Sequence, residues 1–150
     1  MRRTLSLCLA TLILAAPGAA FAQASTLPPH AWLFGTWTGG IFPAPPNVSS
    51  QACLSQPVVI FTRDLVMRAT LTEQLLTQRE IETARAAPQG AEFRFAAARA
   101  APGLLGGGLR GIGFGCESPD VLHVQRRGEN EIAFPGCADF PNPLVRCHTR

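Results

Sequence analysis

The feature that most constrains the fold of this chain is a succession of short β-strand patterns that end at glycine, proline or polar turns. Val58 to Arg63 is β-branched and aromatic, which is typical of a strand. Residues 121–126 and 131–134 alternate around a polar Arg-Gly-Glu-Asn turn, and this pattern predicts a hairpin. Together these signals favour an all-β domain, an antiparallel meander that forms a small barrel or sandwich.

One segment, residues 64–86, has an ambiguous pattern. Apolar residues recur every four positions between 67 and 75, as in a helix, whereas residues 79–83 alternate as in a strand. We favour two strands, over residues 64–72 and 77–86. A helix around 64–86, in an α+β fold, is the alternative.

The second of these strands leads into the turn sequence Pro88-Gln89-Gly90, and residues 92–95 alternate beyond it. This arrangement predicts a hairpin. Its register would place Phe93 and Phe95 on the face shared with Ile81 and Thr83, with the arginines and glutamates in solvent.

The N-terminus has the three zones of a secretory signal peptide: Arg2 and Arg3, an apolar run, and the small-x-small site Ala20-Phe21-Ala22. The apolar run has about a dozen residues, whereas a membrane-spanning helix needs about 20. We therefore expect residues 1–22 to be removed, residues 23–30 to form a mobile arm and residues 31–150 to form a single β domain. The mature chain would be periplasmic or extracellular, without a membrane span.

Removal of the signal peptide also changes the charge. The 150 residues include 13 basic residues, all arginine, and 10 acidic residues, for a net charge of +3. Without Arg2 and Arg3, eleven arginines face ten acids and the net charge is +1. This near-neutral charge argues against nucleic acid as a partner. The use of arginine without lysine fits a GC-rich, more often bacterial, genome.

Four cysteines remain in the exported chain, and an even number in an oxidising compartment favours two disulfides. The predicted hairpin brings Cys116 and Cys137 together at its open end. Among the three possible pairings we therefore favour Cys116–Cys137 with Cys53–Cys147. A zinc site at Cys137, Cys147 and His148 is the alternative, but it lacks the close paired spacings of zinc motifs. We expect no metal and no cofactor.

Catalytic patterns are weak. None of the serines has a G-x-S-x-G setting, and His123 stands on a strand between Leu122 and Val124, where it would face solvent. The other histidines are His30 in the arm and His148 near the end of the chain. We therefore expect a protein that is not an enzyme, with a small hydrolase as the least favoured alternative.

Two further patterns have simple structural explanations. Gly106, Gly108 and Gly111 form a G-x-G-x-x-G sequence, but the strand pattern that follows them does not fit a phosphate-binding βαβ unit. The carboxylate pairs Glu80/Glu82 and Glu129/Glu131 have arginines nearby, and solvated ion pairs explain them.

The aromatic segment 32–40 is the most informative for function. The two indoles, of Trp32 and Trp37, would close one end of a barrel, and Gly35 would let the chain pass beneath them. Gly35-Thr36-Trp37 resembles the opening strand of the calycins, the group that contains the lipocalin barrels. The run from Leu27 to Trp37 also resembles the start of the small periplasmic inhibitors of bacterial secreted metalloproteases.

These resemblances imply an eight-stranded barrel in which Trp37 is the plug and residues 23–28 insert into the cleft of a protease. The chain departs from the inhibitors in having four cysteines rather than a single bridge, and a proline-rich insertion at residues 43–57.

The combined expectation is an exported binding protein of unknown ligand. Its partner would be an apolar small molecule held in the barrel, or a protein contacted by the N-terminal arm. The candidate ligand-binding or barrel-plug residues are aromatic: Trp32, Trp37, Phe93, Phe95, Phe114 and Phe134.

Overall fold

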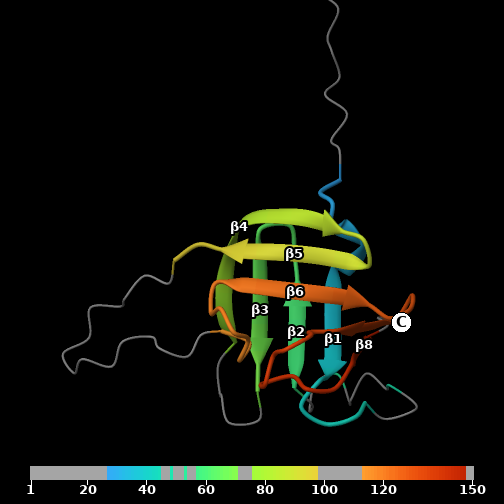
Figure 1. Cartoon of the computed structure of the whole chain (residues 1–150). Helices are drawn as coiled ribbons and strands as arrows, with labels where there is room; N and C mark the ends of the chain where they lie inside the picture. Colours follow the sequence, from blue (N-terminus) through green and yellow to red (C-terminus); the bar gives the residue numbers. More distant parts are fainter. Residues whose placement is uncertain are drawn as a thin grey trace, which may run out of the picture.

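A computed structural model describes residues 27–44, 48, 53, 57–70, 76–97 and 113–147. In these ranges the chain forms a short 3-10 helix, η1, and eight antiparallel strands that close into a barrel (Figure 1). The elements are η1 (Ala31–Leu33), β1 (Gly35–Gly39), β2 (Val58–Phe61), β3 (Leu65–Ala69), β4 (Thr77–Ala87), β5 (Gly90–Phe95), β6 (Val121–Arg126), β7 (Glu131–Ala133) and β8 (Leu144–Arg146). Every strand pairs with its neighbours in sequence, and β8 pairs with β1. The predicted all-β meander is confirmed, and of the two architectures it is the barrel.

The ambiguous segment forms two strands. Its two halves, β3 and β4, pair antiparallel, with Leu65 opposite Glu80 and Arg68 opposite Thr77. The helical alternative for residues 64–86 is wrong, because here backbone hydrogen bonds between neighbouring strands replace those that a helix would make. Residues 71–75, which carried part of the four-residue spacing, lie outside the described residues.

The register of the β4–β5 hairpin agrees with the prediction at Ile81 but not at Thr83. Ile81 lies opposite Phe95, but a β-bulge follows, so that Thr83 pairs with Arg94 and Ala84 faces Phe93. A bulge adds one residue to one strand and reverses which face the later side chains occupy. The prediction that Thr83 shares the face of Ile81 is therefore wrong, and Thr83 is exposed.

The prediction that the arginines of this hairpin are solvated is wrong at Arg79 on β4, which is 4% exposed. Arg68 on β3, outside the hairpin, is also buried, at 3% exposure. Arg79 stands two residues before Ile81, so the strand alternation directs both side chains to the same face. The strand alternation by itself indicates this inward position, whereas the polarity of the side chain favours solvent.

The aromatic segment 32–40 is divided between two elements. Trp32 belongs to η1, and β1 begins at Gly35, where φ is +117°. That left-handed backbone conformation favours glycine and separates the 3-10 turn from the strand. The two tryptophans consequently lie in different elements with different exposures.

The barrel has two distinct ends (Figure 1). η1, the β4–β5 turn and the β6–β7 loop meet at one end, which we call the η1 end. At the opposite end, the segment 113–120 and the segment between β7 and β8 cover the barrel, and we call this the cap end. No helix among the described residues is long and apolar enough to cross a membrane.

Candidate functional site

The η1 end is closed by side chains from η1 and β1. Leu33 and Trp37 are completely buried, and His30 is 2% exposed. Trp37 Nε1 donates to the carbonyl of Leu33 at 2.8 Å, which holds the 3-10 turn over the indole. The His30 Nε2 lies 3.2 Å from the carbonyl of Thr62, and a carbonyl only accepts, so Nε2 carries the proton.

These contacts make Trp37 a plug and change the boundary of the arm. His30, which the sequence assigned to a mobile arm, packs edge-on against Phe34 and Phe93 inside the barrel end. Leu27 is 77% exposed. The chain therefore becomes anchored between Leu27 and His30, while residues 23–26 lie outside the described residues.

Arg146 of β8 completes this closure, a role that the sequence did not reveal. Its guanidinium lies over the ring of Trp37 and donates to the carbonyls of Phe34 at 2.8 Å and Trp32 at 2.5 Å. Burial, and to a smaller extent the positive charge of Arg126, lower the pKa of Arg146. The positive charge of Arg126 is therefore close enough to Arg146 to affect its protonation equilibrium.

The interior of the barrel is occupied by phenylalanine rings. Six rings form a continuous chain of contacts with centroid separations between 5.6 and 6.4 Å, and all six are buried: Phe61, Phe93, Phe95, Phe114, Phe134 and Phe140. The four phenylalanines singled out from the sequence are thus brought together, together with two that were not. They contact one another, as side chains do in a packed core.

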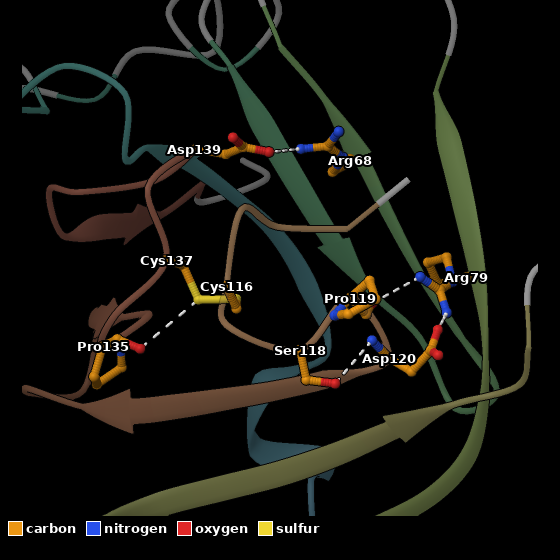
Figure 2. Close-up of a disulfide and its surroundings, with 9 residues drawn as sticks. All are labelled: Arg68, Arg79, Cys116, Ser118, Pro119, Asp120, Pro135, Cys137 and Asp139. Atoms are coloured by element: carbon orange, nitrogen blue, oxygen red, sulfur yellow. Dashed lines mark hydrogen bonds and ion pairs between the residues drawn. A yellow bond between two sulfur atoms is a disulfide. The ribbon is translucent and has the colours of Figure 1, made fainter. Parts of the chain in front are cut away.

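Phe114 reaches this cluster from outside the sheet. The segment that carries it is fastened by the disulfide Cys116–Cys137 (Figure 2). Gly115 has φ +66°, and a Cβ there would lie 2.6 Å from the backbone nitrogen of Asp139. Only glycine fits this close approach, which seats Phe114 in the mouth of the barrel.

Two buried arginines attach the cap to the barrel wall (Figure 2). Arg79 donates to Asp120 at 2.5 Å and to the carbonyl of Pro119 at 2.9 Å, and Arg68 donates to Asp139 at 2.7 Å. A buried guanidinium is costly unless it is paired, so each arginine requires its carboxylate. Both ends of the barrel are therefore closed by residues of the chain itself.

The second disulfide joins Cys53 to Cys147, so the bridges are the two that the hairpin geometry favoured. The zinc alternative is wrong, because Cys137 and Cys147 belong to different disulfides and neither offers a thiolate. His148 lies outside the described residues. Within those residues no group of three or more His, Cys, Asp or Glu side chains is arranged to hold a metal.

His123 faces solvent between two buried neighbours, as its strand position predicted, with its side chain 61% exposed. Its Nδ1 lies 3.6 Å from a carboxylate oxygen of Glu92 on the adjacent strand. No described serine completes a catalytic set with it, and the hydroxyl of Ser118 accepts from the backbone of Asp120. The glycines Gly106, Gly108 and Gly111 lie outside the described residues.

The carboxylate pairs are exposed on the outer wall: Glu80, Glu82, Glu129 and Glu131. Arg79, expected beside the first pair, instead bonds Asp120 inside the barrel. Within the described part of the chain, no ion pair joins these four glutamates to an arginine.

Among the described residues, two hollows are lined on the outer surface. The first, of about 420 Å³, is at the η1 end between Trp32, Pro88–Gly90, Arg126 and Arg127. The second, of about 400 Å³, lies along the loop after β7 and is lined by Phe134, Pro135, Ala138 and Arg127. Arg127 lines both, so the two hollows adjoin at the same side chain.

Trp32 differs from the other aromatic candidates because it is only half-buried and lies in the first hollow. The guanidinium carbon of Arg126 is 5.2 Å from its ring centroid. Of the six aromatic residues predicted from the sequence, this is the one that is not buried.

Together, these features define the class of the molecule: a small, closed, antiparallel eight-stranded β-barrel with two disulfides and a core filled by its own side chains. Comparisons with protein family models, with curated proteins and with solved structures found no match. The likeness to the calycins therefore rests on the general shape of the barrel.

Proposed function

We propose that this chain is an exported protein without catalytic activity that binds a protein partner through the outer surface of its barrel. The observation that carries the proposal is the packing of the interior among the described residues, where the aromatic rings contact one another. Phe114 lies in the cap-end mouth and Leu33 and Trp37 lie in the other, and all three are buried. A ligand carrier of this size needs an enclosed space for its ligand, so the described interior favours recognition on the outside.

The cysteine chemistry supports export. Both disulfides join parts of the chain that are distant in sequence, 94 and 21 positions apart. Such bridges persist in oxidising compartments and are rare in the cytosol. They agree with the signal-peptide pattern of residues 1–22, which lie outside the described residues.

A second candidate is an inhibitor-like module that acts through its N-terminal arm. The observation that favours it is the contrast between Leu27, which is strongly exposed, and His30, which is fixed in the barrel end. An arm attached to a rigid base loses less conformational entropy on binding than one on a mobile base.

Site-specific photo-crosslinking in the producing cells tests the proposal. A benzophenone amino acid would replace Gln89 at the η1 end, Glu82 on the β4 wall or Ala138 at the cap end, all of which are exposed. We expect one discrete covalent adduct with a protein from one face and none from the others. Native mass spectrometry of the purified protein provides the complementary measurement.

Two results would contradict the proposal. An apolar small molecule that co-purifies in a one-to-one complex would show that the chain is a ligand carrier. The absence of a crosslinked adduct at all three positions would show that the chain has no protein partner there. The arm is tested separately by deletion of residues 23–27. This deletion leaves His30 and the carbonyl of Pro28, which accepts from Ala31, in place. Partner binding that survives it would exclude the inhibitor-like mode.

A further inference from the structure

We infer that the hollow between Trp32, the β4–β5 turn and the β6–β7 loop is a recognition site for acidic side chains of a protein partner. This inference rests on the proposed function and names the chemistry of the partner surface. We call this hollow the Trp32–Arg126 site. Its lining is Trp32, Ala87–Gly90 and Arg126–Gly128.

Arg126 presents a free guanidinium edge in this site. Its guanidinium carbon lies 5.2 Å from the centroid of the Trp32 ring, and its Nε donates to the carbonyl of Gly128 at 3.3 Å. The two terminal nitrogens have no partner among the described residues. A guanidinium stacked on an aromatic ring with its terminal nitrogens free matches the two oxygens of a carboxylate.

Arg127 adds a second positive charge. Its backbone nitrogen donates to the carbonyl of Glu131, which fixes the loop, and its side chain is exposed. Neither Arg126 nor Arg127 has an ion pair with a carboxylate in the part of the chain that the structure describes. Glu129 in the same loop and Glu131 at the start of β7 are exposed and form no described ion pair with these arginines.

Arg146 raises the local positive potential further. It is half-buried at the same barrel end, where it donates to the carbonyls of Phe34 and Trp32, and the charge of Arg126 disfavours its protonated form. Charges of one sign that are close enough to disfavour one another attract an anion. An acidic group bound to Arg126 would relieve this repulsion.

The backbone beside the hollow is closely packed. A Cβ at Gly90 would lie 1.8 Å from the carbonyl of Val124, so no side chain fits at this position. The backbone nitrogen of Arg126 donates to the carbonyl of Gln89 at 2.7 Å, which holds the turn against β6. The site is therefore a pre-formed feature of the barrel end, and binding needs little reorganisation.

An acidic protein segment is favoured over a polyanion or a free phosphate by the charge of the molecule. The mature chain is near neutral, and two exposed arginines, Arg126 and Arg127, line this hollow, while exposed glutamates lie on the neighbouring loop and strands. A polyanion would meet those glutamates, whereas isolated carboxylates on a protein surface would meet the arginines alone. The part-exposed indole of Trp32 offers an apolar contact that a phosphate cannot use.

The test uses the full mature chain with both disulfides and a fluorescein-labelled pentaglutamate peptide as the probe. Pentaglutamine, inorganic phosphate and sodium acetate are the comparison ligands. We expect pentaglutamate to bind, pentaglutamine not to bind, and phosphate to compete only weakly. In a proton–nitrogen NMR spectrum, the Trp32 indole signal should shift on binding while that of buried Trp37 stays in place.

Arg126→Gln and Arg127→Gln should each weaken pentaglutamate binding by about tenfold, as the loss of a charge-assisted hydrogen bond implies. The matched control is Arg94→Gln, which removes the same charge from an exposed position on β5. Gly128→Leu is a second, independent variant, since a Cβ at Gly128 meets nothing within 4 Å. It should fill the hollow and abolish binding without loss of thermal stability.

Three outcomes would overturn the inference. In the first, Arg94→Gln weakens pentaglutamate binding as much as Arg126→Gln does. In the second, phosphate saturates the site and pentaglutamate does not compete with it. In the third, Gly128→Leu binds pentaglutamate as tightly as the natural chain. Failure of the inference is distinguishable from failure of the proposed function. A protein adduct that still forms from Gln89 in the Arg126→Gln, Arg127→Gln double variant would retain a protein partner and reject acidic recognition.

Discussion

The guanidinium of Arg146 lies across the indole ring of Trp37, with its central carbon 4.2 Å from the ring centroid. The same side chain bonds the carbonyl of Phe34, 112 positions earlier in the chain. Arg146 is on the last strand and Trp37 on the first, so this contact crosses the β1–β8 pairing that closes the barrel. The closure of the sheet and the closure of the η1 end therefore depend on one arginine.

Replacement of Arg146 by methionine should lower the free energy of unfolding by about 2–3 kcal/mol, because it removes two hydrogen bonds to a charged group and a cation–π contact. Arg146→Lys should recover less than half of this loss, since an ammonium cannot present the planar fork that reaches both carbonyls. Urea unfolding followed by tryptophan fluorescence measures both effects.

The control for Arg146 is Arg94→Met, which should change the stability by no more than about 0.5 kcal/mol because Arg94 is exposed. Equal losses in the two methionine variants would show that Arg146 does not hold the η1 end.

Asp120→Asn and Asp139→Asn should each loosen the cap. Either change leaves a buried arginine without its carboxylate, and we expect a loss of about 1–3 kcal/mol, reduced by the partial exposure of both acids. Hydrogen exchange should accelerate in residues 113–120 more than in η1. Glu117→Gln, at an exposed position in the same segment, should leave the exchange pattern unchanged.

Phe93→Ala should open a cavity in the filled core and cost about 3–5 kcal/mol. A void lined by the remaining rings is dry and can admit a small apolar molecule such as benzene. We expect NMR shifts on addition of benzene in the variant and none in the natural protein. The exposed Phe42, replaced by alanine, is the control. Shifts of core signals in the natural protein would reveal an open interior and contradict the filled core.

The two disulfides should contribute unequally. In the chain-entropy model, Cys53–Cys147, which spans 94 positions, stabilises by about 5 kcal/mol, and Cys116–Cys137, which spans 21, by about 3 kcal/mol. Serine replacement of each pair, followed by denaturant unfolding, measures the difference. Loss of the shorter bridge should also speed hydrogen exchange in the cap. A larger loss from the shorter bridge would contradict the entropic ordering.

Much of the sheet was predictable because strand signals are local. The hairpin of β6 and β7 occurs where the alternating residues and the polar turn predicted it, and His123 faces solvent as its position between Leu122 and Val124 indicated. The split of residues 64–86 followed from the turn at Pro88-Gln89 beyond it. The bulge before Thr83 was not predictable, because it depends on how β5 pairs with β4 in space.

The candidate site was predicted less well. Trp37 is buried at the barrel end where the sequence predicts a plug, but Trp32, which the same pattern pairs with it, is separated from it by a 3-10 turn and Gly35. Arg126 and Arg127 were noted only as neighbours of two glutamates. Their place beside Trp32 arises from the meeting of three loops that are distant in sequence.

By itself, the sequence determined the order of the strands, their antiparallel pairing and the two most plausible disulfides, because alternation, turn residues and cysteine number act over short stretches of chain. Only the tertiary structure decided that the barrel is filled and that its mouths are closed. Those properties depend on contacts between distant residues: Arg68 reaches a carboxylate 71 positions away and Arg79 one 41 positions away. An arginine on an inward-facing position is stable only when such a partner exists, and no local pattern specifies it.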